Sequence, residues 1–504
     1  MVIGGGTAGS VLASRLSEDP AVTVVLAEAG ALTGPATMAV PSAWPKLLGT
    51  PVDWAFRTAP QTALGGRNLP YPRGKVLGGT SAINGMMHVR AHREGYDSWA
   101  RGGALGWGFS DLLPHFRRSE DAPGRDPAYR GLGGPMQVLV PERLNSFELF
   151  VLDAAVELGL PVSPDLNGAD QEGFGWVEQN IVAGRRQSAS DAYLSPVVAD
   201  RPNLTIVGDA IVGRLVFAGT TCTGVEVTHA GRHRVLRAAR EVVLCGGAIG
   251  TPQLLLVSGV GPAARLSELG IDVRAHLPGV GANLQDHSMC RIVRQTGQPV
   301  SSGPELHAIL TAMLRTDAAD GAPDVQLFFW DVPDFPMGRS DGYAIGVAVL
   351  RPRSRGSLTL ASADPAVAPV IDPGLLTAPE DIGVLEDGMR IAREVAATKA
   401  LAIWGAAEIP SGDGIREYLR ATAHSGMHPV GTCRIGLDSD AVVDSELRVH
   451  GVSNLRVADA SVMPGLVGAN PNATVLAIAE RAAALISGKA SKWRPSDVDR
   501  VGTC

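Results

Sequence analysis

The chain has 504 residues, of which 45% are hydrophobic and 19% charged, and its net charge is -7. This composition excludes an intrinsically disordered chain, and the lack of a basic stripe argues against nucleic acid as a partner. No stretch approaches the roughly 20 apolar residues of a membrane-spanning helix. Glycine is the outlier, with 61 residues, well above its usual share of roughly 7%.

The cysteines are few, far apart and odd in number, and none forms a C-x-x-C pair. This pattern argues against a disulfide framework and against a zinc cluster, so we expect no metal site. Because no signal-peptide pattern precedes the first motif, we expect a cytoplasmic protein. Lys is scarce beside Arg, Ala and Gly, which is typical of GC-rich bacterial genes. The cysteines are Cys222, Cys245, Cys290, Cys433 and Cys504.

The chain opens with a βαβ unit that carries a dinucleotide-binding fingerprint. Residues 1–3 predict a strand, a helical pattern follows until Asp19–Pro20, and residues 22–26 are typical of a buried parallel strand. The turn between strand and helix reads G-x-G-x-x-G, so phosphates are expected at the helix N-terminus. The residues expected to bind the cofactor here are Gly4, Gly6, Thr7, Ala8 and Gly9.

An acidic residue, Glu28, follows the second strand of this unit, 19 residues after the last glycine of the fingerprint. Its carboxylate is placed to accept hydrogen bonds from an adenosine ribose, with Ala29 beside it. A carboxylate at this position disfavours a 2′-phosphate and therefore NADP. The fingerprint alone does not separate FAD from NAD.

Further elements alternate along the chain. Helices are predicted over residues 146–160, 252–258, 380–397 and 473–486. Strands are predicted over residues 204–207, 211–217, 223–227, 241–245, 325–329, 343–350, 357–361 and 455–458. The strand-and-glycine pattern of the first unit returns after residue 241 and again near the C-terminus.

This order predicts an α/β fold with an interleaved α+β cap. We expect a discontinuous, Rossmann-like FAD-binding domain built from residues 1–145, 200–290 and 430–490. Residues 146–199 and 291–429 are expected to form a substrate-binding cap domain around an antiparallel sheet, and residues 491–504 a C-terminal tail.

Several long strings resemble the signatures of the glucose–methanol–choline (GMC) oxidoreductases. Residues 74–86 (GKVLGGTSAINGM) resemble the first signature, and residues 247–261 (GAIGTPQLLLVSGVG) match the second throughout. Residues 279–287, 428–434, 457–461 and 470–474 add further family-like strings. Because these strings are ordered and spread over residues 2–486, the chain is identified as a member of this family.

The resemblance implies FAD, held in an extended pose across the fold. Residues of the first signature would line the pyrophosphate and the isoalloxazine, Val212 would meet the adenine, and the 457–461 string would meet the ribityl phosphate. Some members tether FAD through a histidine, but the matching position here is Ile83, so non-covalent FAD is expected. The implied contacts are Val76, Gly79, Thr80, Asn84, Gly85, Met86, Met87, Val212, Asp459, Ala460 and Asn472.

The resemblance also selects one of the eleven histidines as the catalytic base. His428 matches the catalytic histidine of the family, and its unperturbed pKa near 6.5 suits that role. The partner that the resemblance implies is Asn470, whose amide can donate a hydrogen bond to the substrate oxygen but cannot act as a second base. His287 and His424, which lie near motifs, are interpreted as structural.

The cap is expected to select the substrate. Within the strand over residues 325–330 the side chain of Phe329 points away from Phe328 and Trp330, and one of these faces could line a pocket. We assign Phe329 and Met427 as candidate substrate contacts. Met427 precedes the catalytic histidine, where the family often has an aromatic residue. With no acidic pair for a quaternary ammonium, the expected substrate is an uncharged, partly apolar alcohol and not choline.

Three functions follow from this reading. The first is an FAD-dependent oxidase or dehydrogenase that oxidises a primary or secondary alcohol and passes electrons to oxygen, a quinone or a redox protein. The second is a hydroxynitrile-lyase-like enzyme in which FAD stays redox-silent, and the third is a non-enzymatic flavoprotein. The chain is expected to be a monomer or a homodimer without a membrane span.

Overall fold

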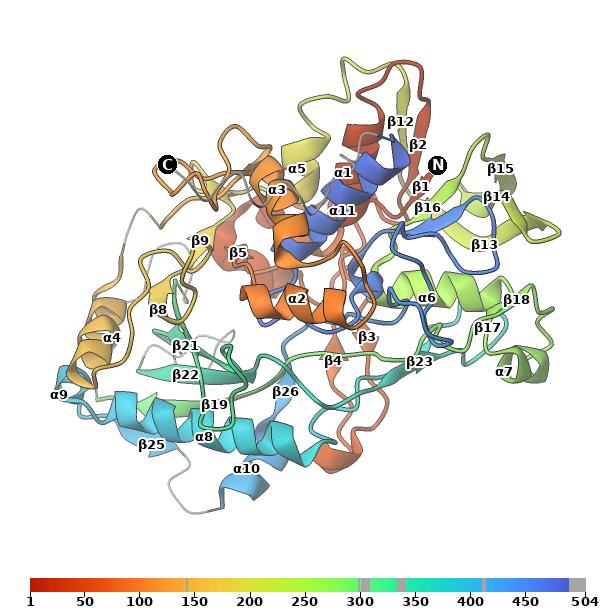
Figure 1. Cartoon of the computed structure of the whole chain (residues 1–504). Coiled ribbons are helices and arrows are strands. Elements are labelled where there is room, and N and C mark those ends of the chain that lie inside the picture. The colour runs from red at the N-terminus through yellow and green to blue at the C-terminus, as the bar shows by residue number, and fades with distance from the viewer. Residues whose placement is uncertain (142–143, 298–299, 301–308, 333–340, 410–413, 489–504) are drawn as a thin grey trace.

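The computed structural model describes residues 1–141, 144–297, 300, 309–332, 341–409 and 414–488. The predicted tail over residues 491–504, including Cys504, lies outside the described residues. Two sheets and the helices that cover them make up most of this part of the chain (Figure 1).

The first sheet is parallel and has five strands. Its order is β12 (Leu204–Val207), β2 (Val24–Ala27), β1 (Val2–Ile3), β16 (Val242–Leu244) and β27 (Leu455–Val457). Strand β1 pairs with β2 on one side and with β16 on the other. The strand order therefore reverses beside β1, and the crevice at the carboxyl ends of β1 and β16 is where such folds bind their ligand.

Two helices that are distant in sequence pack side by side beside this sheet, α1 (Thr7–Leu16) and α11 (Asn472–Ile486) (Figure 1). Small alanine side chains on both helices allow the close approach. Arg15 of α1 forms an ion pair with the buried Glu480 of α11 at 2.8 Å. The C-terminal helix thus packs on the N-terminal unit.

A three-stranded antiparallel meander follows β12 and leads back into the parallel sheet. Its strands are β13 (Ala210–Ala218), β14 (Thr221–His229) and β15 (Arg232–Arg237). Helix α6 (Gly247–Val257) begins directly after β16 and packs against β13. The predicted strand-to-glycine-to-helix junction at residue 246 is confirmed.

The second sheet is mainly antiparallel and belongs to the cap. Its order is β25 (Ala407–Ile409), β19 (Ser288–Gln295), β22 (Gly342–Val349), β21 (Val325–Trp330), β20 (Leu310–Leu314) and β8 (Gly173–Trp176). Strand β26 (His424–Ser425) also pairs with β19. Helix α8 (Pro379–Ala396) packs on β19, β21 and β22, and α4 (Ser146–Glu157) packs against α8.

The cap sheet is buried on both faces, which decides where its aromatic residues point. Every residue of β21 is buried. Val325, Leu327 and Phe329 face a core that α8 and α4 share, whereas Phe328 and Trp330 face the opposite side. Phe329 stacks on Phe174 with ring centroids 5.5 Å apart. It is therefore a core residue of the helix-covered face.

The predicted domain boundaries assign two segments to one domain, but these segments pack in the other. Helix α5 (Ala189–Tyr193) packs on α1, although it lies inside residues 146–199. Conversely, Leu64 and Leu69 are buried in the core that also holds α4 and α8. The two domains therefore exchange short segments near both boundaries.

Shorter elements fill the connections. These are η1 (Ala36–Ala39), η2 (Pro41–Leu47), β3 (Phe56–Arg57), η3 (Thr62–Leu64), β4 (Pro70–Tyr71), η4 (Gly79–Ala82), β5 (Met87–His88), α2 (Arg93–Arg101), α3 (Phe109–Ser119), β6 (Glu120–Asp121), β7 (Met136–Gln137), β9 (Glu178–Gln179), β10 (Ile181–Val182), β11 (Arg185–Arg186), β17 (Val260–Gly261), α7 (Ala263–Glu268), β18 (Ala275–His276), β23 (Ser357–Thr359), β24 (Val370–Asp372), α9 (Lys399–Ala402), α10 (Ile415–Thr422) and η5 (Ala460–Val462).

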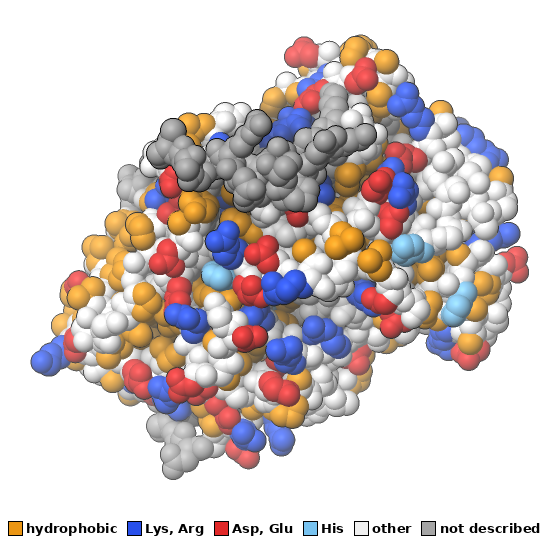
Figure 2. Space-filling view, in the orientation of Figure 1, with side chains coloured by type: hydrophobic (Ala, Val, Ile, Leu, Met, Phe, Trp, Pro, Cys, Tyr) orange, Lys and Arg blue, Asp and Glu red, His pale blue; other side chains and the backbone are white. Residues whose placement is uncertain are grey.

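The surface mixes charges of both signs. On the face shown in Figure 2, Lys and Arg side chains alternate with Asp and Glu, with hydrophobic residues between them. None of the described helices is both long and apolar enough to cross a lipid bilayer.

Candidate active site

A cavity of about 1880 Å³ lies between the two sheets. Gly4 and Gly246, which follow β1 and β16, line one part, and Phe328 and Trp330 of the cap sheet line another. Pockets for one small molecule usually measure roughly 300–1,000 Å³. The cavity therefore has room for an extended dinucleotide together with a substrate.

The fingerprint turn packs so tightly that two of its glycines admit no side chain. A Cβ at Gly9 would lie 1.8 Å from the carbonyl oxygen of Gly4, and one at Gly4 would lie 2.5 Å from that of Cys245. Gly4 also has a φ of +99°, which favours glycine. By contrast, a Cβ at Gly6 or Gly250 would meet no atom closer than 3.4 Å.

Glu28 lines the cavity, and its carboxylate also holds the turn. Its oxygens accept hydrogen bonds from the backbone N–H groups of Gly5, at 2.6 Å, and Gly30, at 2.8 Å. Burial raises the pKa of Glu28 to about 7. Because each carboxylate oxygen can accept more than one hydrogen bond, capacity for ribose hydroxyls remains.

The first-signature segment packs directly on the fingerprint turn. A Cβ at Gly79 would lie 2.6 Å from the Cα of Gly6, so the two backbones touch. The hydroxyl of Thr80 accepts from the N–H of Gly74, and the side-chain oxygen of Asn84 accepts from Arg186 at 3.0 Å. Gly79, Thr80, Asn84, Gly85, Met86 and Met87 all line the cavity.

Val76 is the member of this segment that does not line the cavity. It is fully buried in a small core with Leu47, Val52, Ala82 and Ile83. A direct contact between its side chain and a cofactor is therefore not supported, and its role is to pack beneath the segment.

All but one of the remaining predicted cofactor residues line the same cavity. Thr7, Ala8, Ala29, Val212, Ala460 and Asn472 line it, whereas Gly9 is buried behind the turn. The hydroxyl of Thr7 donates to the side-chain oxygen of Asn472 at 2.8 Å, which joins α1 to α11. Asp459 also lines the cavity, but its carboxylate accepts from Thr251, Gly247 and Ser461 and so holds the start of α6.

The two predicted catalytic residues meet at the cavity wall. The side-chain Nδ2 of Asn470 donates to Nε2 of His428 at 3.3 Å. The other side-chain atom of Asn470, Oδ1, is buried without a hydrogen-bond partner among the described residues. A buried polar atom without a partner costs free energy unless a ligand satisfies it.

A second histidine fixes the protonation pattern of His428. Nε2 of His287 lies 3.1 Å from the carbonyl oxygens of Leu350 and Val467, so this nitrogen must carry a proton. Burial lowers the pKa of His287 to about 4, and the neutral ring therefore has a bare Nδ1. That atom lies 2.9 Å from Nδ1 of His428, which must donate to it. The hydrogen-bond pattern thus assigns a bare Nε2 to neutral His428.

Neighbouring groups also keep His428 neutral. Burial lowers the pKa of His428 well below its usual value, and the nearby His287 and Arg73 lower it further. An imidazole without a proton on Nε2 can accept one. His428 is therefore in the protonation state that a general base requires.

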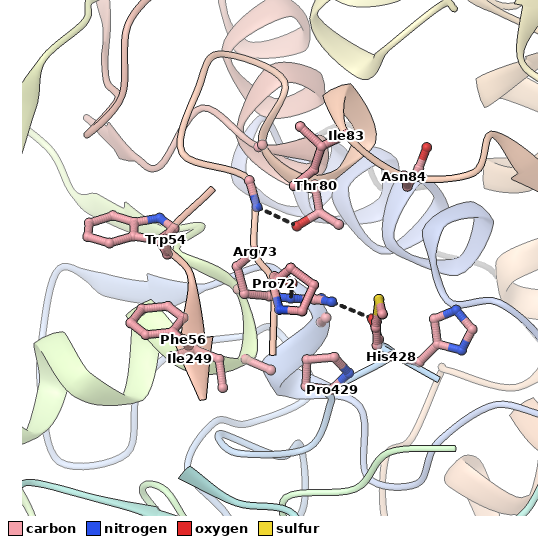
Figure 3. Close-up of a pocket in the computed structure, with 18 of the residues that line it drawn as sticks. Trp54, Phe56, Pro72, Arg73, Thr80, Ile83, Asn84, Ile249, His428 and Pro429 are labelled. Carbon is pink, nitrogen blue, oxygen red and sulfur yellow. Dashed lines mark hydrogen bonds between the residues drawn. The ribbon is translucent and has the colours of Figure 1, made fainter. Parts of the chain in front are cut away.

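The turn that carries His428 is held in a strained conformation. Met427, with a φ of +64°, is one of the non-glycine residues in the left-handed region. The guanidinium of Arg73 donates to its carbonyl oxygen (Figure 3). Oγ of Ser425 accepts from the N–H of Met427 at 2.7 Å. The carboxylate of Asp286 accepts from the N–H of His428 at 2.8 Å and from the hydroxyl of Ser425. We call Arg73, Asp286 and Ser425 the turn clamp.

The candidate substrate contacts divide. Met427 lines the cavity, but Phe329 does not, because the cap strand directs it into the helix-covered core. The aromatic residues that line the cavity from this strand are Phe328 and Trp330. Alternation along the strand separated the two faces correctly, but the wrong face was assigned to the substrate.

Sequence reasoning did not assign His287 and Arg73 to the site. His287 was interpreted as structural, although it ends the family-like string over residues 279–287, and that string was the available signal. Arg73 directly precedes the first signature and carried no separate signal. His424 also lines the cavity. Within the described ranges, no group of three or more metal-ligating side chains comes together.

The residues present fit FAD. The fingerprint turn offers backbone N–H groups at a helix N-terminus, and Glu28 lies where an adenosine ribose would bind. Gly250 leaves open space beside the backbone, and a Cβ at Gly6 would meet only the Cα of Gly79, at 3.8 Å. The unpartnered Oδ1 of Asn470 lies beside His428, at the part of the cavity shared with the cap.

Comparison with known families agrees with this geometry. Two family models, both described as "GMC oxidoreductase", match the chain. The N-terminal model matches residues 1–289 and the C-terminal model matches residues 352–479. Both matched ranges contain residues of the site, including Glu28 in the first and His428 in the second.

Individual relatives match almost the whole chain. Human mitochondrial choline dehydrogenase is 38% identical, over 98% of this chain and 90% of its own. The oxygen-dependent choline dehydrogenase of Brucella anthropi is 38% identical, over 97% and 95%. Among solved structures, pyridoxine 4-oxidase from "Mesorbium loti" is 33% identical, with a TM-score of 0.92 and coverage of 97% and 98%. The chain therefore belongs to the GMC oxidoreductase family of FAD-dependent enzymes that act on CH–OH donors.

Proposed function

We propose that this enzyme oxidises a primary or secondary alcohol to the aldehyde or ketone, with His428 as the general base. The observation that carries the proposal is the bare Nε2 of His428, at the cavity wall and 3.3 Å from the amide of Asn470. The relatives named choline dehydrogenase and pyridoxine 4-oxidase are consistent with an alcohol substrate.

The protein residues divide the work of alcohol oxidation. Nε2 of His428 takes the hydroxyl proton, and the amide N–H of Asn470 donates a hydrogen bond to the substrate oxygen as negative charge develops on it. FAD, when bound, supplies the acceptor, N5, for the hydride that leaves the carbinol carbon. The turn clamp keeps His428 in place, and Nδ1 of His287 accepts the hydrogen bond from Nδ1–H of His428.

We further propose that the FAD is not covalently attached. Ile83 occupies the position that matches the tethering histidine of some family members, and a hydrocarbon side chain cannot form that bond. It lines the cavity and is almost fully buried. The fingerprint turn, Glu28 and residues 79–87 would hold the cofactor by hydrogen bonds and packing alone.

The electrons must leave the reduced cofactor for an external acceptor, and we propose oxygen, a quinone or a redox protein. A panel of these acceptors, assayed with one oxidisable alcohol, ranks them directly. We place the enzyme in the cytoplasm, a reducing compartment, because the four cysteines among the described residues, Cys222, Cys245, Cys290 and Cys433, are free thiols.

The test of the proposed function is anaerobic mixing of the FAD-loaded enzyme with a panel of alcohols. Bleaching of the flavin absorption band supports it. Cyanohydrin cleavage without bleaching, or no bleaching with any alcohol, would overturn it. In His428→Ala the rate of bleaching should fall on the order of 10²-fold or more, with FAD content unchanged.

The matched control is His424→Ala. His424 lines the same cavity, but its side chain hydrogen-bonds to the carbonyl oxygen of Thr422 and not to His428. This variant should therefore keep bleaching within a few-fold of the wild type. An equal loss in both variants would contradict the assignment of the base.

A further inference from the structure

A buried arginine lies beneath the first-signature segment. Arg186 of β11 is only 6% exposed, and its guanidinium donates to three oxygen atoms around that segment. Nε donates to the carbonyl oxygen of Met38 at 2.8 Å, and Nη1 donates to the carbonyl oxygen of Ser81 at 3.2 Å and to Oδ1 of Asn84 at 3.0 Å. These bonds join η1 to the segment that begins with η4.

The positive charge of Arg186 is not paired with a carboxylate. Among the described residues, its Nη2 is buried without a hydrogen-bond partner and its guanidinium forms no ion pair. Asp191 acts on it only from a distance, because that carboxylate accepts from the N–H and the hydroxyl of Ser188 at the start of α5. Burial lowers the pKa of Arg186 to about 10, so the side chain is still charged at neutral pH. Such a buried charge is costly unless an anion compensates it.

Arg186 also fixes the orientation of the Asn84 amide. Oδ1 of Asn84 accepts from Nη1 of Arg186 and from the backbone N–H of Met86, each at 3.0 Å. Because both of these groups are donors, the atom of Asn84 that faces them must be the oxygen. The amide nitrogen, Nδ2, is therefore the atom that remains to donate, and Asn84 lines the cavity (Figure 3).

Asn84 lies between the cofactor turn and the cap. On one side of it in the chain, Gly79 touches the fingerprint turn at Gly6, where the pyrophosphate is expected. On the other side, Met87 packs against the cap cluster that contains Met289. An FAD that extends from the turn toward the cap would therefore pass its flavin ring along the part of the wall that holds Asn84.

Hydride transfer brings negative charge to the flavin. The oxidised ring is neutral, and a hydride adds two electrons and one proton, so the reduced ring is an anion until a further proton binds. A fixed positive charge in a low-dielectric interior stabilises such an anion without reorganisation.

We propose that Arg186 sets the reduction potential of the flavin, because its charge, relayed through the oriented amide of Asn84, favours the reduced form. This inference rests on the proposed function, in which the hydride of the alcohol supplies the negative charge. Arg186 does not line the cavity, so it is a positioning residue and not a catalytic one.

Redox titration of the FAD-loaded enzyme with a chemical reductant and a reference dye tests the inference without any alcohol. In Arg186→Met, binding of reduced relative to oxidised flavin should weaken about tenfold, which lowers the midpoint potential by about 30 mV. Arg186→Lys keeps the charge and should keep most of the potential. Arg185→Met is the matched control, because Arg185 is the exposed neighbour on the same strand, and it should have the wild-type potential. A wild-type potential in Arg186→Met overturns the inference.

A second variant leaves the arginine in place. In Asn84→Asp a carboxylate faces the guanidinium, so the charge of Arg186 is compensated while its bonds to Met38 and Ser81 remain. The midpoint potential should fall at least as far as in Arg186→Met. An unchanged or higher potential in Asn84→Asp would contradict the relay.

The affinity for FAD separates this role from simple retention of the cofactor. If Arg186 only anchors the segment or compensates the pyrophosphate, Arg186→Met weakens the binding of oxidised and reduced FAD equally and the potential does not move. Weaker binding of oxidised FAD in equilibrium dialysis, with a wild-type potential, therefore overturns the inference.

The titration also distinguishes this inference from the proposed function. A shifted potential in Arg186→Met supports the role of Arg186 even if no alcohol bleaches the flavin. Bleaching by an alcohol together with an unshifted potential keeps the proposed function and overturns the role of Arg186.

Discussion

His287 and His428 meet through their Nδ1 atoms, 2.9 Å apart, and only one of these atoms can carry the shared proton. The two carbonyl oxygens at Nε2 of His287 decide which, since they require a proton on that nitrogen. The proton between the rings therefore belongs to His428, and its catalytic nitrogen is left bare. Two backbone carbonyls on the far side of His287 thus set the chemistry of the site.

The first prediction concerns this pair. His287→Leu removes the acceptor for the Nδ1 proton of His428, so the ring can turn or change tautomer. We expect flavin reduction to slow by about tenfold or more, with FAD content unchanged. Stopped-flow absorbance as a function of pH measures the effect.

The conservative variant for this prediction is His287→Asn. Its side-chain oxygen can occupy the position of Nδ1 and accept the same proton, so most of the rate should return. If His287→Asn is as slow as His287→Leu, the acceptor at this position does not set the tautomer.

The second prediction uses Asn470 to move the pKa of His428. A carboxylate in Asn470→Asp would lie beside Nε2 and favour the protonated imidazole, which raises its pKa. Because the protonated ring cannot act as a base, the acid limb of kcat/KM should move to higher pH. Asn470→Ala should lower kcat/KM without moving that limb. The same limb in both variants would show that His428 is not the titrating group.

The third prediction concerns the turn clamp. Ser425→Ala removes the group that accepts from the N–H of Met427 and donates to Asp286. With the left-handed turn no longer held, we expect kcat to fall about tenfold and KM to change less. Steady-state kinetics with one alcohol measure both constants.

A second substitution tests the cause of that loss. Glycine adopts a positive φ without strain, so Ser425→Ala combined with Met427→Gly should recover part of kcat. Met427→Gly alone is the control for the altered cavity wall. If kcat of the double variant is lower than the product of the two single effects predicts, the clamp does not act by opposing backbone strain at residue 427.

The fourth prediction concerns stability at acid pH. The pKa of His115, of His287 and of His424 is lowered to about 4, chiefly by burial. In the unfolded chain these three histidines bind protons near pH 6.5. In the folded chain they bind them only near pH 4. The contribution of these histidines to the free energy of unfolding is therefore fully present above pH 6.5, and it is lost as the pH falls toward 4.

His115 gives the cleanest measurement because it lies on α3, which the cavity does not include. His115→Gln should flatten the fall in melting temperature between pH 6.5 and 5, with little change at pH 8. Over this interval the free energy of unfolding of the wild type should fall by roughly 1 kcal/mol per pH unit more than that of the variant. Parallel curves for the two proteins would show that His115 is not titrating differently on folding.

The fifth prediction concerns the cofactor linkage. Acid precipitation of the FAD-loaded wild type should leave all of the yellow colour in the supernatant, because Ile83 cannot form a covalent bond to the flavin. Flavin in the pellet of the wild type would contradict non-covalent binding. Mass spectrometry of the intact protein gives the same answer independently.

Much of the fold and of the site follows from local sequence patterns. Gly4, Gly6, Gly9 and Glu28 lie within one βαβ unit, where spacing alone sets which groups meet. His428 and Asn470 were found through family-like strings, and the structure brings their side chains together. In both cases the information is contained in a few neighbouring residues.

The features that sequence reasoning missed depend on contacts between distant elements. Alternation along β21 shows that Phe328 and Phe329 face opposite sides, but both faces are buried, so composition does not tell which one meets the cavity. Only the packing of α8 against the Phe329 face decides it. Likewise, His287 and His428 are 141 positions apart and come together through the pairing of β19 with β26.

The hydrogen bond between Thr7 and Asn472 spans 465 positions of the chain. During synthesis, the turn that begins the cofactor site leaves the ribosome long before the helix that completes the site. The site therefore cannot close on FAD until α11 has been made. A nascent chain that stops before α11 has the fingerprint but not the partner of Thr7, so capture of the cofactor waits for the helix that carries Asn472.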